Sequence, residues 1–121
     1  MTIQEVADQL VGFCREGKFR EAIEALYSPD IVSMEAGAPS GGSRVTRGIE
    51  AVRSKNDRWN ANHEPHSTVV EGPLVTGSHF VVTMKMDLTS KPDGRRFTME
   101  EVAVYEVADG KIVYEEFFYR L

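Results

Sequence analysis

Cysteine is scarce in this sequence of 121 residues, since Cys14 is the single one. An intrachain disulfide and a CxxC metal or redox motif are therefore excluded, and we expect a reducing, cytoplasmic location. Long apolar runs are also missing. No segment approaches the roughly 20 apolar residues that span a bilayer, and the first residues, MTIQEVADQLVGF, carry charges where a signal peptide would be apolar. We expect a chain that is neither exported nor held in a membrane.

Clustered positive charge is missing as well. The chain has 14 Lys and Arg against 19 Asp and Glu, a net charge of −5, and its longest basic run is the pair Arg95 and Arg96. Phosphate binding needs concentrated positive charge, so we expect no nucleic-acid partner. No GxGxxG, P-loop, GxSxG or HExxH pattern occurs. The sequence thus lacks the motifs typical of nucleotide-cofactor binding and of serine hydrolases, and we expect no cofactor.

The N-terminal half shows helical spacing. The length of the whole chain and its 41% hydrophobic content suit one domain over residues 1–121. The 3,4 spacing of Ile3, Val6 and Leu10 predicts a first helix, capped by Thr2 and ended by Gly17. A second helix is predicted from Phe19 to the residue before Ser28-Pro29, a strand over 31–36, a Gly/Pro/Ser-rich loop over 37–42, and a third helix over 49–63.

The C-terminal half alternates as strands do. Runs over 66–71, 78–89, 96–107 and 111–119 are separated by turn signals, including Gly72-Pro73. Helices followed by a meander of strands predict an α+β fold with an antiparallel sheet packed on the helices. Both faces of the last two strands carry large apolar groups. We therefore expect a homodimer through the outer sheet face, with Val102, Val104 and Phe118 near its centre.

Nearly the whole chain, from about residue 6 to 119, resembles a known family. The order of elements, with LYSPDIVSMEAG after the second helix and VYEVADGKIVYEEFFY at the end, is similar to SnoaL-like polyketide cyclases of the nuclear-transport-factor-2-like superfamily. The closest likeness is to a bacterial branch of unassigned function. The resemblance implies a cone-shaped half-barrel, also described as cystatin-like, around one small-molecule pocket. This superfamily includes isomerases, cyclases, dehydratases and binders, so fold does not decide function.

Glu35 is the first candidate catalytic residue. The segment SPDIVSMEAG is similar to the ketosteroid isomerase segment in which a carboxylate is the general base. A carboxylate in an apolar pocket has a raised pKa, which suits proton transfer. The alternative is an exposed or ion-paired glutamate. That isomerase also needs hydrogen-bond donors for an oxyanion, and the matching positions here are Leu10 and Ala103, whose side chains cannot donate. Glu101 lies two residues from Ala103 on the same face and is a candidate acid, slightly displaced from the matching position.

The third predicted helix carries a polar and aromatic line. Lys55, Trp59 and His63 share a face that we expect to overlook the pocket, where they can stack a flat ligand and move a proton. Alternatively, Trp59 plugs the cone and His63 caps the helix C-terminus. His63 and His66 have metal-ligand spacing, but Pro65 between them interrupts regular geometry, so we expect no metal.

Glu115 and Tyr105 complete the predicted lining, with Met34 as an apolar contact that packing alone also explains. An inward glutamate among apolar residues is costly unless paired or protonated, which is typical of sites. A β-bulge would instead put Glu116 inward and Glu115 in solvent. We expect a small hydrophobic ligand and leave open whether the protein is a carboxylate-histidine isomerase, cyclase or dehydratase, a binding module, or a dimerisation domain.

Overall fold

Two short helices open the structure, a computed structural model that describes residues 1–38 and 42–120. Helix α1 (Ile3–Arg15) begins at Thr2, whose side chain accepts from the Glu5 backbone while the Glu5 side chain accepts from the Thr2 backbone. This reciprocal capping confirms the predicted helix start. Helix α2 (Phe19–Leu26) follows. Tyr27 ends the helix as its C-cap residue and begins the next strand, so this strand starts four residues earlier than predicted.

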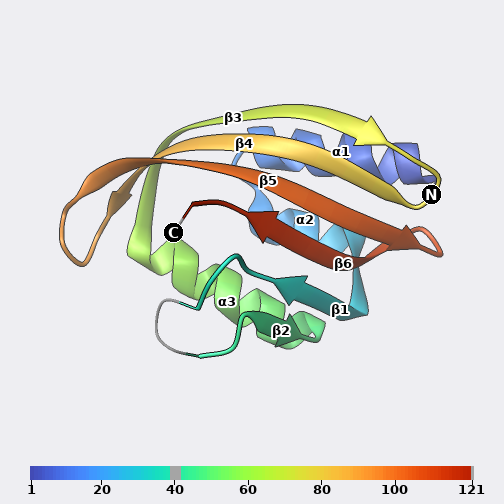
Figure 1. The fold of residues 1–121 in the computed structure, drawn as a ribbon, viewed down its shortest axis with the longest axis horizontal. Coiled ribbons are helices and arrows are strands. Elements are labelled where there is room, and N and C mark those ends of the chain that lie inside the picture. The colour runs from blue at the N-terminus through green and yellow to red at the C-terminus, as the bar shows by residue number, and fades with distance from the viewer. Residues whose placement is uncertain (39–41, 121) are drawn as a thin grey trace.

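The remaining elements build one sheet and one further helix (Figure 1). The sheet order is β2-β1-β6-β5-β4-β3, with every neighbouring pair antiparallel except β1 and β6. The bounds are β1 (Tyr27–Met34), β2 (Val45–Arg47), α3 (Ile49–Asn62), β3 (His63–Val75), β4 (His79–Ser90), β5 (Arg96–Ala108) and β6 (Lys111–Phe118). Three helices on a curved, unclosed sheet confirm the predicted α+β half-barrel, although the β1–β6 pair makes the sheet mixed rather than antiparallel.

Several predicted boundaries move. Strand β2 was not predicted; it pairs with β1 beyond the predicted loop, of which residues 39–41 lie outside the described part of the chain. Strand β3 starts at His63 and continues through Gly72-Pro73, which had been predicted as a turn. The pairing with β4 instead shifts register there, between Glu71 and Leu74. Gly72 has φ +114°, and a Cβ would lie 3.0 Å from the Val81 carbonyl oxygen, so this position requires glycine.

The core lies between the helices and the concave face of the sheet. Strand β4 confirms its predicted alternation, because Phe80, Val82, Met84, Met86 and Leu88 are all buried. The ring of Phe80 stacks on that of Tyr105 of β5 at 4.8 Å between centroids. Helix α1 packs Val6, Leu10 and Cys14 into this core.

The inward face of β6 changes after a register shift. Strict alternation from Glu115 would place Ile112 on the outer face, but the shift between Glu106 and Val107 pairs Val107 with Ile112 and buries Ile112 completely. Beyond the shift, Tyr105 pairs with Glu115, so Glu115 faces inward. The alternative that placed Glu116 inward is therefore wrong. Glu115 as a whole is 3% exposed, and this burial is the starting point for the site.

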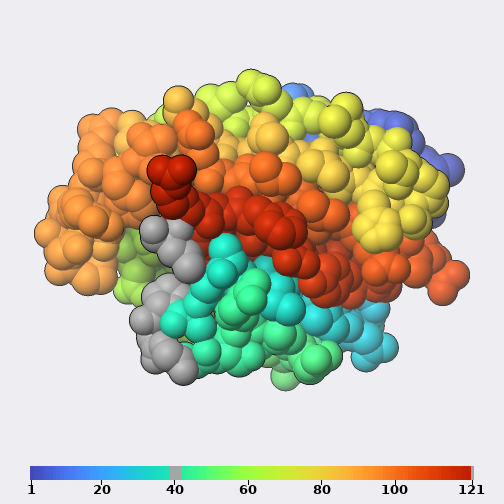
Figure 2. All heavy atoms as spheres, in the orientation of Figure 1, coloured from blue at the N-terminus to red at the C-terminus, as the bar shows by residue number. Residues whose placement is uncertain are grey.

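The outer face of the sheet is left uncovered by the helices. In the space-filling view, β4, β5 and β6 form most of the visible surface, and little of α1 or α2 shows behind them (Figure 2). Val102 and Phe118 are cross-strand partners on this face and are 38% and 48% exposed. Val104 lies two residues along β5 and is half-buried.

Candidate functional site

One cavity of about 450 Å³ lies between the three helices and the concave face of the sheet. This is within the usual range for small-molecule sites. Its apolar wall comes from every layer of the fold: Leu10 from α1, Ile23 from α2, Val52 from α3, Met84 and Met86 from β4, Met99 from β5 and Phe117 from β6. An apolar ligand would therefore contact helices and sheet together.

Seven of the eight residues predicted for the site line this cavity: Glu35, Lys55, Trp59, His63, Glu101, Tyr105 and Glu115. Met34 is the exception. Its neighbours Ser33 and Glu35 turn toward the interior, where both bond to Lys55, and alternation along the strand directs Met34 to the opposite face. The prediction that Met34 contacts the ligand is therefore corrected.

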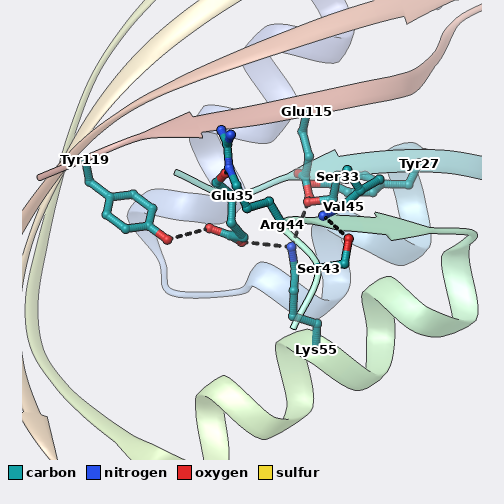
Figure 3. Close-up of polar contacts among 9 residues, drawn as sticks. All are labelled: Tyr27, Ser33, Glu35, Ser43, Arg44, Val45, Lys55, Glu115 and Tyr119. Carbon is teal, nitrogen blue, oxygen red and sulfur yellow. Dashed lines mark hydrogen bonds and ion pairs between the residues drawn. The ribbon is translucent and has the colours of Figure 1, made fainter. Parts of the chain in front are cut away.

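Glu115 forms the buried end of the polar part of the cavity (Figure 3). Its Oε1 accepts a short hydrogen bond from the Tyr27 hydroxyl, and its Oε2 accepts one from the Ser33 hydroxyl at 2.8 Å. Burial raises the pKa of the Glu115 carboxyl, whereas these hydroxyls and the Lys55 ammonium oppose the rise. Both oxygens of Glu115 are thus committed to protein donors.

Lys55 connects Glu115 to the outer part of the cavity. Its ammonium donates to the Ser33 hydroxyl at 2.7 Å and to Glu35 Oε1 at 2.8 Å. The other oxygen of Glu35 accepts from the Tyr119 hydroxyl at 3.0 Å. Burial raises the pKa of Tyr119 to about 12, and the nearby Glu35 carboxylate adds to the rise. A continuous line of hydrogen bonds therefore runs from Tyr27 to Tyr119 (Figure 3).

Glu101 differs from the other two cavity carboxyls. Within the described residues its side chain has no hydrogen-bond or ion-pair partner. Burial raises its pKa to about 8, the carboxylates of Glu35 and Glu115 contribute, and the Lys55 ammonium opposes the rise. The raised pKa favours the protonated form of Glu101 at neutral pH, and the side chain lines the same cavity as the Glu35–Lys55 ion pair.

Trp59 and His63 form an aromatic wall. Their rings stack with centroids 4.4 Å apart, and the edge of Phe97 lies 6.2 Å from His63. His63 Nδ1 lies 2.8 Å from the Trp59 carbonyl oxygen, and since a carbonyl only accepts, Nδ1 is the donor. In the neutral ring Nε2 keeps its lone pair. Capping of the helix end and lining of the pocket, which we had treated as alternatives, occur together.

Sequence reasoning missed four polar residues of the site. Tyr27, Ser33 and Tyr119 hold the carboxylates, and Asn56 lines the cavity beside Lys55. Ser33 could have been found, because it shares the inward face of the strand with Glu35. Tyr27 could not, because it had been assigned to a helix end.

Two features limit the chemistry. Burial raises the pKa of Cys14 to about 12, so its thiol is a poor nucleophile although it lines the cavity. Over residues 1–38 and 42–120, no group of three or more His, Cys, Asp or Glu side chains is arranged to hold a metal ion. In the same part of the chain no helix is long and apolar enough to cross a membrane.

Comparisons with known proteins agree with this architecture. Among curated proteins, no significant match was found. A candidate SnoaL-like polyketide cyclase from Mesorhizobium loti is 42% identical, with a TM-score of 0.92 over 98% of this chain and 100% of its own. A cystatin-like protein of unknown function from Xanthomonas campestris is 18% identical, with a TM-score of 0.79 over 100% of this chain and 92% of its own.

The likeness extends to another bacterial structure and to a family profile. A candidate isomerase from Bacillus subtilis is 18% identical, with a TM-score of 0.75 over 96% of this chain and 84% of its own, which shows the shared fold. Residues 1–119 match the profile of the SnoaL-like domain. The fold is that of the nuclear-transport-factor-2-like proteins, and the chain belongs to the SnoaL-like domain family.

Proposed function

We propose that this protein binds a small, uncharged, apolar compound with a carbonyl group and catalyses its isomerisation or cyclisation by proton transfer. The observation that carries the proposal is the pairing in one cavity of a protonated acid, Glu101, with a carboxylate held in an ion pair, Glu35. Environments that separate the protonation states of two carboxyls are typical of acid-base sites. The Mesorhizobium loti relative, described as a candidate polyketide cyclase, fits this class of substrate.

Each residue has a defined part in the proposed step. Glu35 takes the proton from the carbon next to the carbonyl, and the electron pair of that C–H bond forms a carbon–carbon double bond. The carbonyl π electrons move to oxygen, which receives the proton of Glu101. In a substrate with a β,γ double bond, Glu35 then gives its proton to the γ-carbon, the electrons of the dienol shift to form the α,β double bond and the carbonyl, and the enol proton returns to Glu101, which completes an isomerisation. Trp59 and His63, stacked on each other, form one aromatic wall beside the ligand.

Hydrogen exchange tests this proposal without knowledge of the natural substrate. The protein in D2O should replace α-hydrogens of the bicyclic ketone 2-decalone by deuterium, followed by proton NMR. Glu35→Gln should slow this exchange by at least about 100-fold, because a general base contributes that much. The melting temperature should change by no more than a few degrees. Glu21→Gln, an exposed glutamate on α2, is the matched control and should exchange like the wild type. Unchanged exchange in Glu35→Gln would move the base to His63.

A non-catalytic binding module is the second candidate. Leu10 and Ala103 stand where ketosteroid isomerase has its oxyanion donors, and both are buried apolar residues here. Binding of 2-decalone without any deuterium exchange in the wild type would favour this function over catalysis.

We also propose that two copies associate through the outer sheet face. The support is the exposed apolar pair of Val102 and Phe118, centred on strands that the helices leave uncovered. Such a patch is buried most simply by a second copy around a two-fold axis. Light scattering at micromolar concentration should give twice the 13.5 kDa of the chain. Phe118→Glu should give the monomer, whereas a wild-type mass near 13.5 kDa would contradict the proposal.

The cytoplasm is the proposed location. The support is the single cysteine, Cys14, which is 2% exposed and unable to form an intrachain disulfide. Fractionation of the native cells, with detection by antibody, tests this directly.

A further inference from the structure

Asn56 carries an unexplained polar atom in the cavity wall. Its Nδ2 is buried and has no hydrogen-bond partner, and within residues 1–38 and 42–120 it is the one buried side-chain nitrogen or oxygen in this condition. A buried donor without an acceptor destabilises a folded protein, so such atoms are rare and call for a physical reason. The residue itself is part of the cavity lining.

The position of Asn56 on α3 places it among residues that face the ligand space. Val52 lies one turn before it and is 2% exposed, while Trp59 and His63 follow at helical spacing on the same face. All of them line the cavity. Asn56 is thus the polar position between the apolar part of this helix face and its aromatic end.

The other polar groups near Asn56 narrow the class of acceptor. The positive charge of Lys55 is already compensated by the Glu35 carboxylate, and its ammonium also bonds to Ser33. Glu35, Glu101 and Glu115 would repel a ligand carboxylate or phosphate. An amide N–H requires an acceptor, and an apolar wall favours an uncharged one. An uncharged carbonyl oxygen meets both conditions.

We propose that Asn56 is the specificity-determining residue of the cavity, whose Nδ2 donates a hydrogen bond to the carbonyl oxygen of an uncharged ligand. This inference rests on the proposed function and names the group that selects a carbonyl compound over a hydrocarbon of the same shape. Sites built to bond a polar atom discriminate strongly against the analogue that lacks it, because the protein donor is then left unpaired.

A matched pair of ligands tests the proposal: 2-decalone and 2-methylenedecalin, which replaces the carbonyl oxygen by a methylene group. Trp59 is the only tryptophan in the sequence and lines the cavity, so its fluorescence reports occupancy by either compound. The wild type should bind the ketone about tenfold more tightly than the alkene. Asn56→Leu should reduce this ratio several-fold, with the remainder due to the Glu101 carboxyl, and leave alkene binding unchanged or stronger. Asn60→Leu, on the exposed side of the same helix, should keep the wild-type ratio.

Two further measurements separate the possible failures. Asn56→Asp keeps the shape but only accepts when ionised, so it should bind the ketone at least tenfold more weakly; equal binding would overturn the role of Nδ2 as donor. Asn56→Leu should keep or raise the melting temperature without ligand, because an unpaired donor is removed, whereas a fall of more than a few degrees would make Asn56 structural. A ketone preference in Asn56→Leu as large as that of the wild type, or no preference in the wild type, overturns this inference alone. Failure of the wild type to bind either compound contradicts the proposed function as well.

Discussion

Glu115 and Glu101 lie on neighbouring strands, face the same cavity, and both have a pKa raised mainly by burial, yet their surroundings differ. Glu115 accepts hydrogen bonds from Tyr27 and Ser33 on its two oxygens. Glu101 has no such donor in the described part of the chain. Burial alone therefore does not distinguish a structural carboxyl from a reactive one.

The difference shows how one fold can hold a fixed and a free acid on adjacent strands. A carboxyl whose lone pairs are bonded to protein donors stabilises the fold and is unavailable to a ligand. A carboxyl that stays protonated in an apolar wall keeps its proton for transfer. Glu35 is intermediate, because it is bonded to Lys55 and Tyr119 but belongs to the outer part of the cavity. We therefore expect substitution to affect stability at Glu115 and catalysis at Glu101 and Glu35.

Glu115→Ala should produce the largest effect on the fold. The change leaves the Tyr27 and Ser33 hydroxyls without their acceptor in a buried place and opens a cavity. We expect a loss of about 3 kcal/mol or more in the free energy of unfolding. In a domain of this size that lowers the melting temperature by roughly 10 °C, measurable by calorimetry. Glu116→Ala, on the opposite face of β6, should cost less than about 1 kcal/mol. Equal effects of the two substitutions would remove the contrast between the fixed and the free carboxyl.

Glu101→Gln should have a smaller effect of opposite sign that depends on pH. The pKa of Glu101 is raised from 4.5 to about 8, so between these values the folded state holds a proton that the unfolded state has lost. The contribution of Glu101 to the free energy of unfolding of the wild type is fully present below about pH 4.5 and is lost as pH rises through about 8. Glutamine does not titrate, so Glu101→Gln should match the wild type near pH 4.5 and exceed it above pH 8.

The expected gain above pH 8 is about 4 °C or more, since 1 kcal/mol corresponds to roughly that shift. Thermal melts across pH 4.5 to 9 measure it. Glu100→Gln is the control, because Glu100 is exposed and its nearest cation, on Lys85, is 3.6 Å away. A constant difference between wild type and Glu101→Gln at all pH values would mean that Glu101 is not held protonated. Deuterium exchange by the wild type should also decline as pH rises through about 8.

The fold was predictable where local pattern decides structure. Helical spacing in α1 and alternation in β4 specified their inward faces correctly. The misses depend on pairing between distant segments. Strand β2 has only three residues, too few to show an alternating pattern. Pro29 lies in β1 where the register of β1 with β6 shifts, so the early start of β1 was not visible as a pattern either.

The candidate site shows the same division. Glu35 and Glu101 were found through the resemblance to ketosteroid isomerase, and Glu115 because a glutamate interrupts an apolar inward face. Their partners were not, since Tyr27 and Ser33 lie 88 and 82 residues from Glu115 in sequence and meet it only through the β1–β6 pair. Which glutamate is fixed and which is free depends on these distant contacts. The sequence therefore predicts which chemical groups line the cavity but not which carboxyl is bonded to protein donors and which is available to a ligand.

Tyr119→Phe should have the smallest effect. It tests whether Glu35 is intermediate between the fixed carboxyl of Glu115 and the free carboxyl of Glu101. The hydroxyl donates to Glu35 Oε2 at 3.0 Å from the outer part of the cavity, whereas Lys55 holds Oε1 at 2.8 Å. Because Lys55 remains and water can replace a partly exposed hydroxyl, we expect less than about 1 kcal/mol of lost stability. Deuterium exchange into 2-decalone should slow by only three- to tenfold, since Glu35 keeps its charge but is less firmly positioned. A loss as large as that of Glu35→Gln would instead mean that Tyr119 transfers the proton. No change in exchange would mean that Lys55 alone positions the base.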